Sequence, residues 1–197
     1  KSKEEISEIH DISLRTIDEF IRLARRGFEE YMDVLEVYEN MLIPHQIDIF
    51  MKSIVNKPLN KALKDSKITL DEIEYYYELG KSENGNFRKF YTDYLDLKIR
   101  LYADTILANK SSKIAYKNSN LTEDEFRENK DSIDDLILTG RFSIIEDELE
   151  KHNTSGSKLS KLVGISLDEL YDWYFREKDG EEKFEEFSLM FELGVIL

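Results

Sequence analysis

The sequence predicts an all-α protein, organised as a tandem array of about four helix-turn-helix units of three helices each, called repeats from here on. The first reason is composition: the 197 residues include two prolines and eight glycines, and 36% of them are charged. Little therefore interrupts the stretches in which apolar residues lie three and four apart, as in amphipathic helices. The second reason is a pattern that occurs four times. Its copies open with Ile12 and Ser13, Ile68 and Thr69, Leu121 and Thr122, and Ile165 and Ser166.

The spacing after the hydroxyl residue identifies the copies as one repeated element. Three copies carry an aromatic residue seven positions later: Phe20, Tyr76 and Trp173. The same copies carry apolar residues 18, 21 and 25 positions later: Tyr31, Val34 and Tyr38; Phe87, Phe90 and Tyr94; and Phe184, Phe187 and Phe191. The third copy has Asn129 at the aromatic position, and its stripe of Phe142, Ile145 and Leu149 comes two positions late. We therefore expect a distorted second helix in the third repeat.

The hydroxyl residue of each copy is expected to cap the second helix of its repeat. Such an oxygen accepts a hydrogen bond from a free backbone N–H of the first turn, and a glutamate three residues later completes a capping box. Thr69, Thr122 and Ser166 are each followed at that spacing by a glutamate, whereas Ser13 is followed by Thr16. Three of the four second helices should therefore begin with a full box.

The four repeats are expected at residues 1–50, 51–110, 111–152 and 153–197, and they differ in charge. The net charge of the chain is -14. Residues 51–67 contain five lysines and one aspartate, whereas residues 123–150 contain eleven acidic and three basic side chains. Because phosphate binding depends on lysine and arginine, only the first two repeats are expected to contact a nucleic acid.

The fourth repeat resembles a known DNA-binding family. Residues 158–173, with a Gly-Ile-Ser turn at 164–166, resemble the homeodomain-like helix-turn-helix of phage small terminase subunits and transposase-type DNA-binding domains. Residues 61–94 resemble the same pattern. The resemblance implies a non-enzymatic, DNA-associated protein of the phage or mobile-element type, whose second helices enter the major groove. The fourth repeat departs from the family at Asp168 and Asp172, because carboxylates at these positions repel a polyanion.

Two groups of basic residues are the candidate DNA contacts of the first two repeats. They are Arg15, Arg22, Arg25 and Arg26 in the first repeat, and Lys57, Lys61, Lys64, Arg88 and Lys89 in the second. We expect these side chains to bind the phosphates of double-stranded DNA. The competing interpretation is a solvated helix face, on which the arginines pair with neighbouring acids such as Asp18 and Glu19.

The negative charge also supports a second function, an acidic protein-protein interaction module that presents carboxylates to a basic, nucleic-acid-binding protein partner. Three consecutive tyrosines, at residues 75–77, bear on this alternative. Consecutive helical side chains point about 100° apart, so they cannot all face one core. Tyr76 occupies the aromatic core position, which leaves Tyr75 and Tyr77 either as partner contacts or as packing between repeats.

Catalytic residues, metal sites and cofactors are not expected, and neither is a membrane segment. The chain has no cysteine, which excludes disulfides and thiolate chemistry and fits a reducing compartment. His10, His45 and His152 lie far apart and match no metal-binding spacing. No apolar run approaches the length that crosses a bilayer. The sequence therefore predicts a cytoplasmic protein without enzymatic activity.

Overall fold

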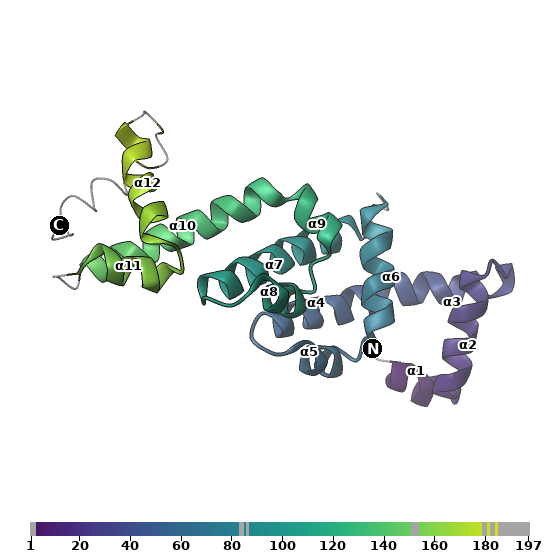
Figure 1. Ribbon diagram of the computed structural model, residues 1–197. Coiled ribbons are helices and arrows are strands. Elements are labelled where there is room, and N and C mark those ends of the chain that lie inside the picture. Colours follow the sequence, from purple (N-terminus) through teal and green to yellow (C-terminus); the bar gives the residue numbers. More distant parts are fainter. Residues whose placement is uncertain are drawn as a thin grey trace. The chain divides into compact units, whose positions relative to one another are not determined.

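The computed structural model describes residues 3–82, 85, 87–150, 154–178, 181 and 184, and the regular elements in these residues are helices (Figure 1). No β-strand occurs among them, which confirms the predicted all-α class. The chain divides into two compact units, unit 1 with residues 1–94 and unit 2 with residues 95–197. The division falls within the helix α7 (Arg88–Leu107).

Unit 1 contains two helix pairs joined by one long helical run. The first pair is α1 (Lys3–His10) and α2 (Leu14–Arg25), and the second is α5 (Leu59–Ser66) and α6 (Leu70–Lys81). The run comprises a 3-10 turn η1 (Glu29–Tyr31), α3 (Met32–Val37), a π turn η2 (Tyr38–Leu42) and α4 (Ile43–Ile54). In the π turn, residues five apart face the same way, so Tyr38 and Ile43 are both buried. α4 continues without a break across the repeat boundary that the sequence predicts between residues 50 and 51.

Unit 2 contains two further helix pairs, α8 (Ser112–Ser119) with α9 (Glu123–Glu128), and α11 (Gly156–Val163) with α12 (Leu167–Lys178). The helix α10 (Lys130–Leu149) connects the pairs. α9 ends after six residues at Asn129, whose side chain donates a hydrogen bond to the Glu125 carbonyl. The short α9 agrees with the distortion predicted for the third repeat. Phe187 and Phe191, the predicted end of the fourth repeat's stripe, lie outside the described residues.

The turn inside each helix pair has the same construction four times. The first helix of every pair spans eight residues and is followed by a residue in the left-handed region. These residues are Asp11 (φ 52°), Lys67 (φ 56°), Asn120 (φ 56°) and Gly164 (φ 68°). An aliphatic residue and the hydroxyl residue then lead into the second helix.

The predicted caps are present at all four turns. The side chains of Ser13, Thr69, Thr122 and Ser166 each accept a hydrogen bond from the backbone N–H three residues later. At Thr69 and Thr122 the glutamate side chain returns the bond to the cap backbone, so two of the three predicted capping boxes are complete. At Ser166 the structure shows the bond from the Glu169 N–H, and the Glu169 carboxylate lies 3.8 Å from Arg141 instead. The hydroxyl residue therefore fixes where each second helix begins.

Unit 2 contains two hydrophobic cores, and α10 contributes to both of them. Ile133 packs in the core that α7, α8 and α9 share, whereas Ile145 packs in the core that α11 and α12 form. The stripe of Phe142, Ile145 and Leu149 is expected from the sequence to serve the third repeat. Instead it packs on the α11–α12 pair, because α10 is long enough for its second half to extend beyond the α8–α9 pair.

A buried ion pair crosses the first core of unit 2. The Lys98 ammonium lies 3.1 Å and 3.3 Å from the two carboxylate oxygens of Glu125. The two side chains are 6% and 5% exposed. Glu125 is also the glutamate of the Thr122 capping box. The pair therefore joins α7 to the start of α9, a link that the sequence spacing does not reveal.

Replacement of Lys98 by methionine is expected to destabilise unit 2 by about 3 to 5 kcal/mol, because the Glu125 carboxylate then stays buried without its ammonium. Lys130→Met is the matched control: it removes a lysine that pairs with Asp134 at an exposed i,i+4 position, where little change is expected. Urea unfolding followed by the fluorescence of Trp173, which lies in unit 2, measures both. Equal midpoints for the two variants would contradict the proposed role of the pair.

Gly164 is expected to tolerate no side chain. Its φ is +68°, and an added Cβ would lie 2.0 Å from the Asn109 side-chain oxygen. Gly164→Ala should therefore destabilise unit 2 by at least about 1 to 2 kcal/mol, the cost of a left-handed residue with a Cβ. Gly85→Ala, where an added Cβ meets no atom within 4 Å, is the control. Because Gly85 lies in unit 1, urea unfolding of these variants is followed by far-ultraviolet circular dichroism, which reports on both units.

Candidate nucleic-acid interface

Three arginines lie on one exposed line along α2: Arg15 and Arg22 within the helix, and Arg26 as its C-cap residue. Ile17, Ile21 and Ala24 form its buried face. At 100° per residue, Arg15, Arg22 and Arg26 lie within about 20° of one line on the opposite side of the helix, over about 16 Å. All three are exposed. α2 therefore presents a row of guanidinium groups to solvent.

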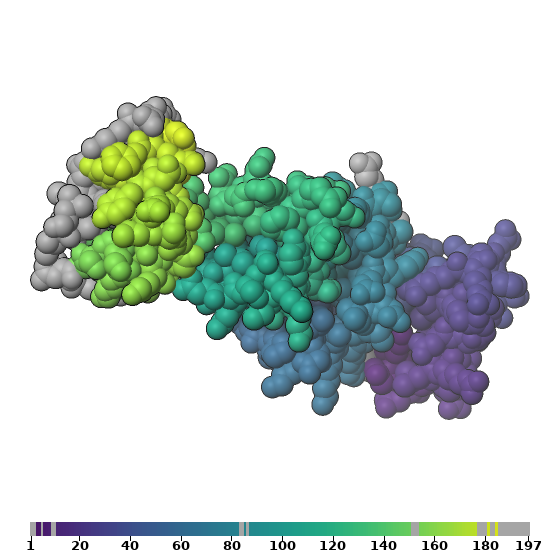
Figure 2. Space-filling view, viewed as in Figure 1, coloured from purple at the N-terminus to yellow at the C-terminus, as the bar shows by residue number. Residues whose placement is uncertain are grey.

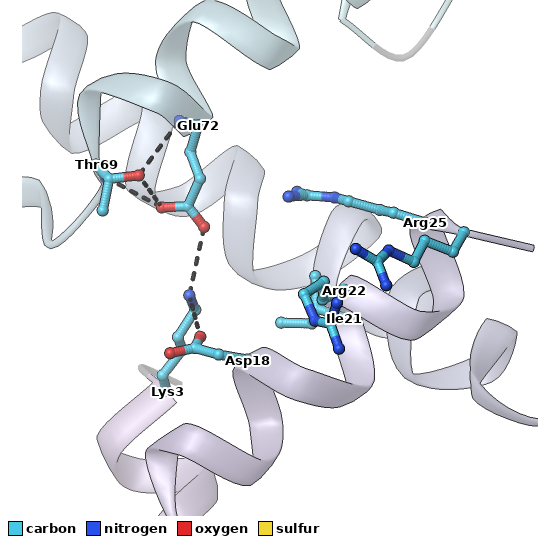
Figure 3. A pocket seen from close by; sticks show the side chains of 8 residues that line it. Lys3, Asp18, Ile21, Arg22, Arg25, Thr69 and Glu72 are labelled. Carbon is cyan, nitrogen blue, oxygen red and sulfur yellow. Dashed lines mark hydrogen bonds and ion pairs between the residues drawn. The ribbon is translucent and has the colours of Figure 1, made fainter. Parts of the chain in front are cut away.

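A hollow of about 440 Å³ lies beside this row, between α2 and α6 (Figure 3). Its lining consists of Lys3, Asp18, Ile21, Arg22, Arg25, Arg26, Thr69 and Glu72. Lys3 links the two acids, with Nζ 2.9 Å from Asp18 Oδ1 and 3.3 Å from Glu72 Oε1 (Figure 3). Four cationic and two anionic side chains line the hollow, so its net charge is positive although the chain as a whole is acidic.

Glu72 stays ionised at this site although it is largely buried. Burial by itself would raise the pKa of its carboxyl group. Hydrogen bonds from the Tyr38 hydroxyl and from Thr69, together with the charge of Lys3, outweigh burial and hold the pKa below its ordinary value. The carboxylate thus caps α6 and binds Lys3, whose positive charge balances it on the side that faces the hollow.

Arg25 joins α2 to α6. Its guanidinium donates a hydrogen bond of 2.6 Å to the Tyr76 hydroxyl and lies over the Tyr75 ring, 4.4 Å from the centroid. Burial would lower the pKa of Arg25, but its contacts with Tyr76 and Tyr75 raise the pKa above its ordinary value. Arg25 is nevertheless exposed and lines the hollow, so its contact with phosphate stays a prediction, made by a guanidinium that Tyr76 and Tyr75 hold in place.

Tyr77 and Tyr75, the two candidate partner contacts, differ in exposure. Tyr77 is only 4% exposed and packs on the rings of Tyr91 and Tyr94, at centroid distances of 4.9 Å and 5.6 Å. The prediction that Tyr77 contacts a partner is therefore wrong, since the first turns of α7 cover that side of α6. Tyr75 is 41% exposed and remains accessible beside Arg25.

The second group of candidate cations does not line the hollow. Lys57 pairs with Asp65 at 2.6 Å, and Lys89 pairs with Asp93. Arg88 lies over the Tyr91 ring, 5.3 Å from its centroid. Lys61 and Lys64 are exposed on α5 and have no ion-pair partner among the described residues. The structure therefore gathers Arg22, Arg25 and Arg26 at one place and leaves the second group on α5, its flank and α7.

Within the exposed row Arg22 is held in an ion pair, because its Nε and Nη2 both donate to the Glu19 carboxylate. The distance from Arg22 Nε to Glu19 Oε2 is 2.8 Å. Both side chains are nearly half exposed, so water screens the pair. Arg15 and Arg26 have no ion pair within the described part of the chain. Lys3 completes the site, and no local pattern singles it out, since its partner Glu72 lies 69 residues away.

No family model, curated protein or solved structure matches this chain. Within the described residues, no three acidic or histidine side chains come close enough together to hold a metal ion. The helices in that part of the chain are also too short or too polar to cross a membrane. A functional argument therefore starts from the arginine row of α2 and the hollow beside it.

Unit 1 is expected to lose stability as the pH rises above about 10. Burial raises the pKa of Tyr38 and of Tyr76 above the ordinary 10.0, and for Tyr38 the hydrogen bond to Glu72 adds to the shift. The folded chain then keeps protons that the unfolded chain releases, so stability is complete below pH 10 and falls by up to about 1.4 kcal/mol per pH unit for each tyrosine.

The double variant Tyr38→Phe/Tyr76→Phe tests this expectation. It removes both titrating groups, so its stability should fall less steeply than that of the natural chain between about pH 9 and about pH 11. Urea unfolding followed by far-ultraviolet circular dichroism gives the two slopes. The same slope in both proteins would show that these hydroxyls do not set the pH dependence.

Proposed function

We propose that the chain is a non-enzymatic, DNA-associated helical protein in which α2 lies along the phosphates of duplex DNA. The observation that carries the proposal is the alignment of Arg15, Arg22 and Arg26 on the exposed side of α2. The resemblance of residues 158–173 and 61–94 to the phage and transposase helix-turn-helix supports the same proposal, because the first pair shares their spacing and such domains contact DNA through the second helix of the pair.

The row of α2 suits phosphate contact better than base reading. Arginine binds phosphate oxygens in a bidentate manner and stays charged at any physiological pH. Duplex DNA carries one charge per about 1.7 Å of axis, so a row about 16 Å long can meet several phosphates. Three such contacts give a slope of log affinity against log salt of about -3. We therefore expect weak binding that depends strongly on salt and little on sequence.

The acids of unit 1 restrict DNA contact to α2. Asp18 and Glu72 beside the row are already paired with Lys3. By contrast, Asp71, Glu74 and Glu78 lie on one exposed face of α6 at i, i+3 and i+7. Such a face repels a polyanion, so the second helix of the second pair is not a DNA contact in this proposal.

Duplex binding measured by fluorescence anisotropy tests the proposal. A labelled duplex should bind at about 50 mM salt, and binding should be lost in the variant Arg15→Ala/Arg22→Ala/Arg26→Ala. The control Lys110→Ala/Lys113→Ala/Lys117→Ala removes the same charge from exposed positions of unit 2 and should keep most of the affinity. Absence of binding at low salt, or an equal loss in both variants, would overturn the proposal.

A second candidate function is the acidic interaction module, and the exposed acidic face of α6 favours it. Asp71, Glu74 and Glu78 have no ion-pair partner among the described residues. A basic protein surface would therefore meet three unpaired carboxylates on one line of the helix. This function takes precedence if the duplex fails to bind at low salt.

A further inference from the structure

We propose that unit 1 binds an amphipathic α-helix of another protein, with basic residues flanking its apolar stripe, on an open apolar face formed by α1, α2 and α3. This face surrounds a hollow of about 380 Å³. Its apolar lining consists of Ile6, Ile12, Ile17, Phe20, Ile21, Val34, Val37 and Tyr38. The proposal concerns a different surface from the arginine row and does not depend on DNA binding.

In the other helix pairs, a preceding helix packs on the pair. Tyr102 of α7, the helix before the α8–α9 pair, packs on Tyr116 and Phe126, with ring centroids 5.0 Å and 5.2 Å away. Phe142 of α10, the helix before the α11–α12 pair, packs on Trp173 at 5.5 Å. Each of these pairs therefore holds an aromatic anchor from a preceding helix. No described helix covers α1 and α2 in this way.

In the α5–α6 pair, α4 takes the same place. Phe50 of α4 is fully buried, and Gln46 donates a hydrogen bond of 3.0 Å to the carbonyl of Lys67, the left-handed residue of the turn. Three of the four pairs are therefore covered by a helix that comes before them in the chain. Figure 2 shows the purple surface of the first helices at one edge of unit 1.

In the first pair, side chains are exposed at positions that are buried in the other pairs. Seven residues before the cap, Ile6 is half-buried, whereas Ala62, Ala115 and Leu159 are each 0% exposed. Twenty-one residues after the cap, Val34 is 36% exposed, whereas the equivalent Phe90 is 6% exposed. Val37 on the same face is 53% exposed. Apolar side chains gathered around a hollow in this way are typical of an interaction surface.

The charges on the α3 side of the face specify the flanks of the partner helix, whereas Lys3, 5.0 Å from the centroid of the Tyr38 ring, is paired with Asp18 and Glu72. Every charged side chain from residue 29 to residue 37 is acidic, and all of them are exposed: Glu29, Glu30, Asp33 and Glu36. Asp33 lines the hollow itself. A helix with lysine or arginine beside its apolar stripe would meet these acids, whereas a helix with acidic flanks would be repelled. α7 shows the apolar spacing that a helix pair accepts, with Ile99, Tyr102 and Ile106 at i, i+3 and i+7.

A synthetic peptide provides the probe. It carries the apolar residues of the second half of α7, Leu95, Ile99, Tyr102 and Ile106, with lysine at the outward positions. Fluorescence anisotropy should show saturable binding to the full chain, and a peptide of the same composition with the stripe broken should not bind. Val37→Lys should weaken binding by about tenfold or more, because it places a charge in the apolar face opposite a basic peptide.

Val55→Lys is the matched control, because Val55 is 58% exposed and lies outside the face. It should leave the affinity unchanged, as should the triple arginine variant of α2, which separates this surface from DNA contact. If both peptides bound equally, or if both lysine variants lost the same affinity, peptide binding would depend on charge alone and the proposal would be overturned. Self-association in sedimentation that Val37→Lys abolishes would instead assign the face to a second copy of the chain.

Discussion

The left-handed residue that ends the first helix of each pair is the constraint on which the rest of the fold depends. It stops the helix after eight residues and turns the next aliphatic residue toward the core: Ile68 and Leu121 are 3% and 4% exposed, and Ile12 and Ile165 are half-buried. A left-handed residue with a Cβ costs about 1 to 2 kcal/mol. The cap that follows contributes about 1 kcal/mol and the buried aliphatic about 1.5 to 3 kcal/mol. The turn is therefore stable with Asp11, Lys67 or Asn120 as well as with Gly164.

The same turn supports surfaces of opposite character, because its stability depends on inward positions and leaves the outward ones free. α2 shows arginines to solvent, whereas α6 shows acids. Between the two helices, Arg25 and Lys3 connect the basic element to Tyr76 and Glu72. The cations nearest the pair interface thus hold the pairs together, and those farther out remain available to a ligand. In unit 1, the cations at the pair interface therefore have partners on α6, whereas Arg15 and Arg26 on the exposed row have no ion pair among the described residues.

The sequence is sufficient to predict features that depend on neighbouring residues and insufficient for those that depend on distant ones. The caps involve atoms three residues apart, and all four occur where the spacing places them. The partner of Arg25 lies 51 residues away and that of Lys98 lies 27 residues away, so local charge patterns cannot identify them. Helical periodicity shows that Tyr77 points away from Tyr76, but the choice between solvent and α7 is decided by the tertiary packing.

The sharing of α10 between two cores has a thermodynamic consequence for unit 2. Each core depends on packing against α10. If α10 unfolds around Ile133, the helix that positions Ile145 in the other core becomes shorter. Local unfolding of one pair therefore destabilises the folded state of the other, as it does for adjacent units of a repeat protein. Unit 2 should behave as one cooperative element, so that a ligand holding either pair would slow hydrogen exchange in both.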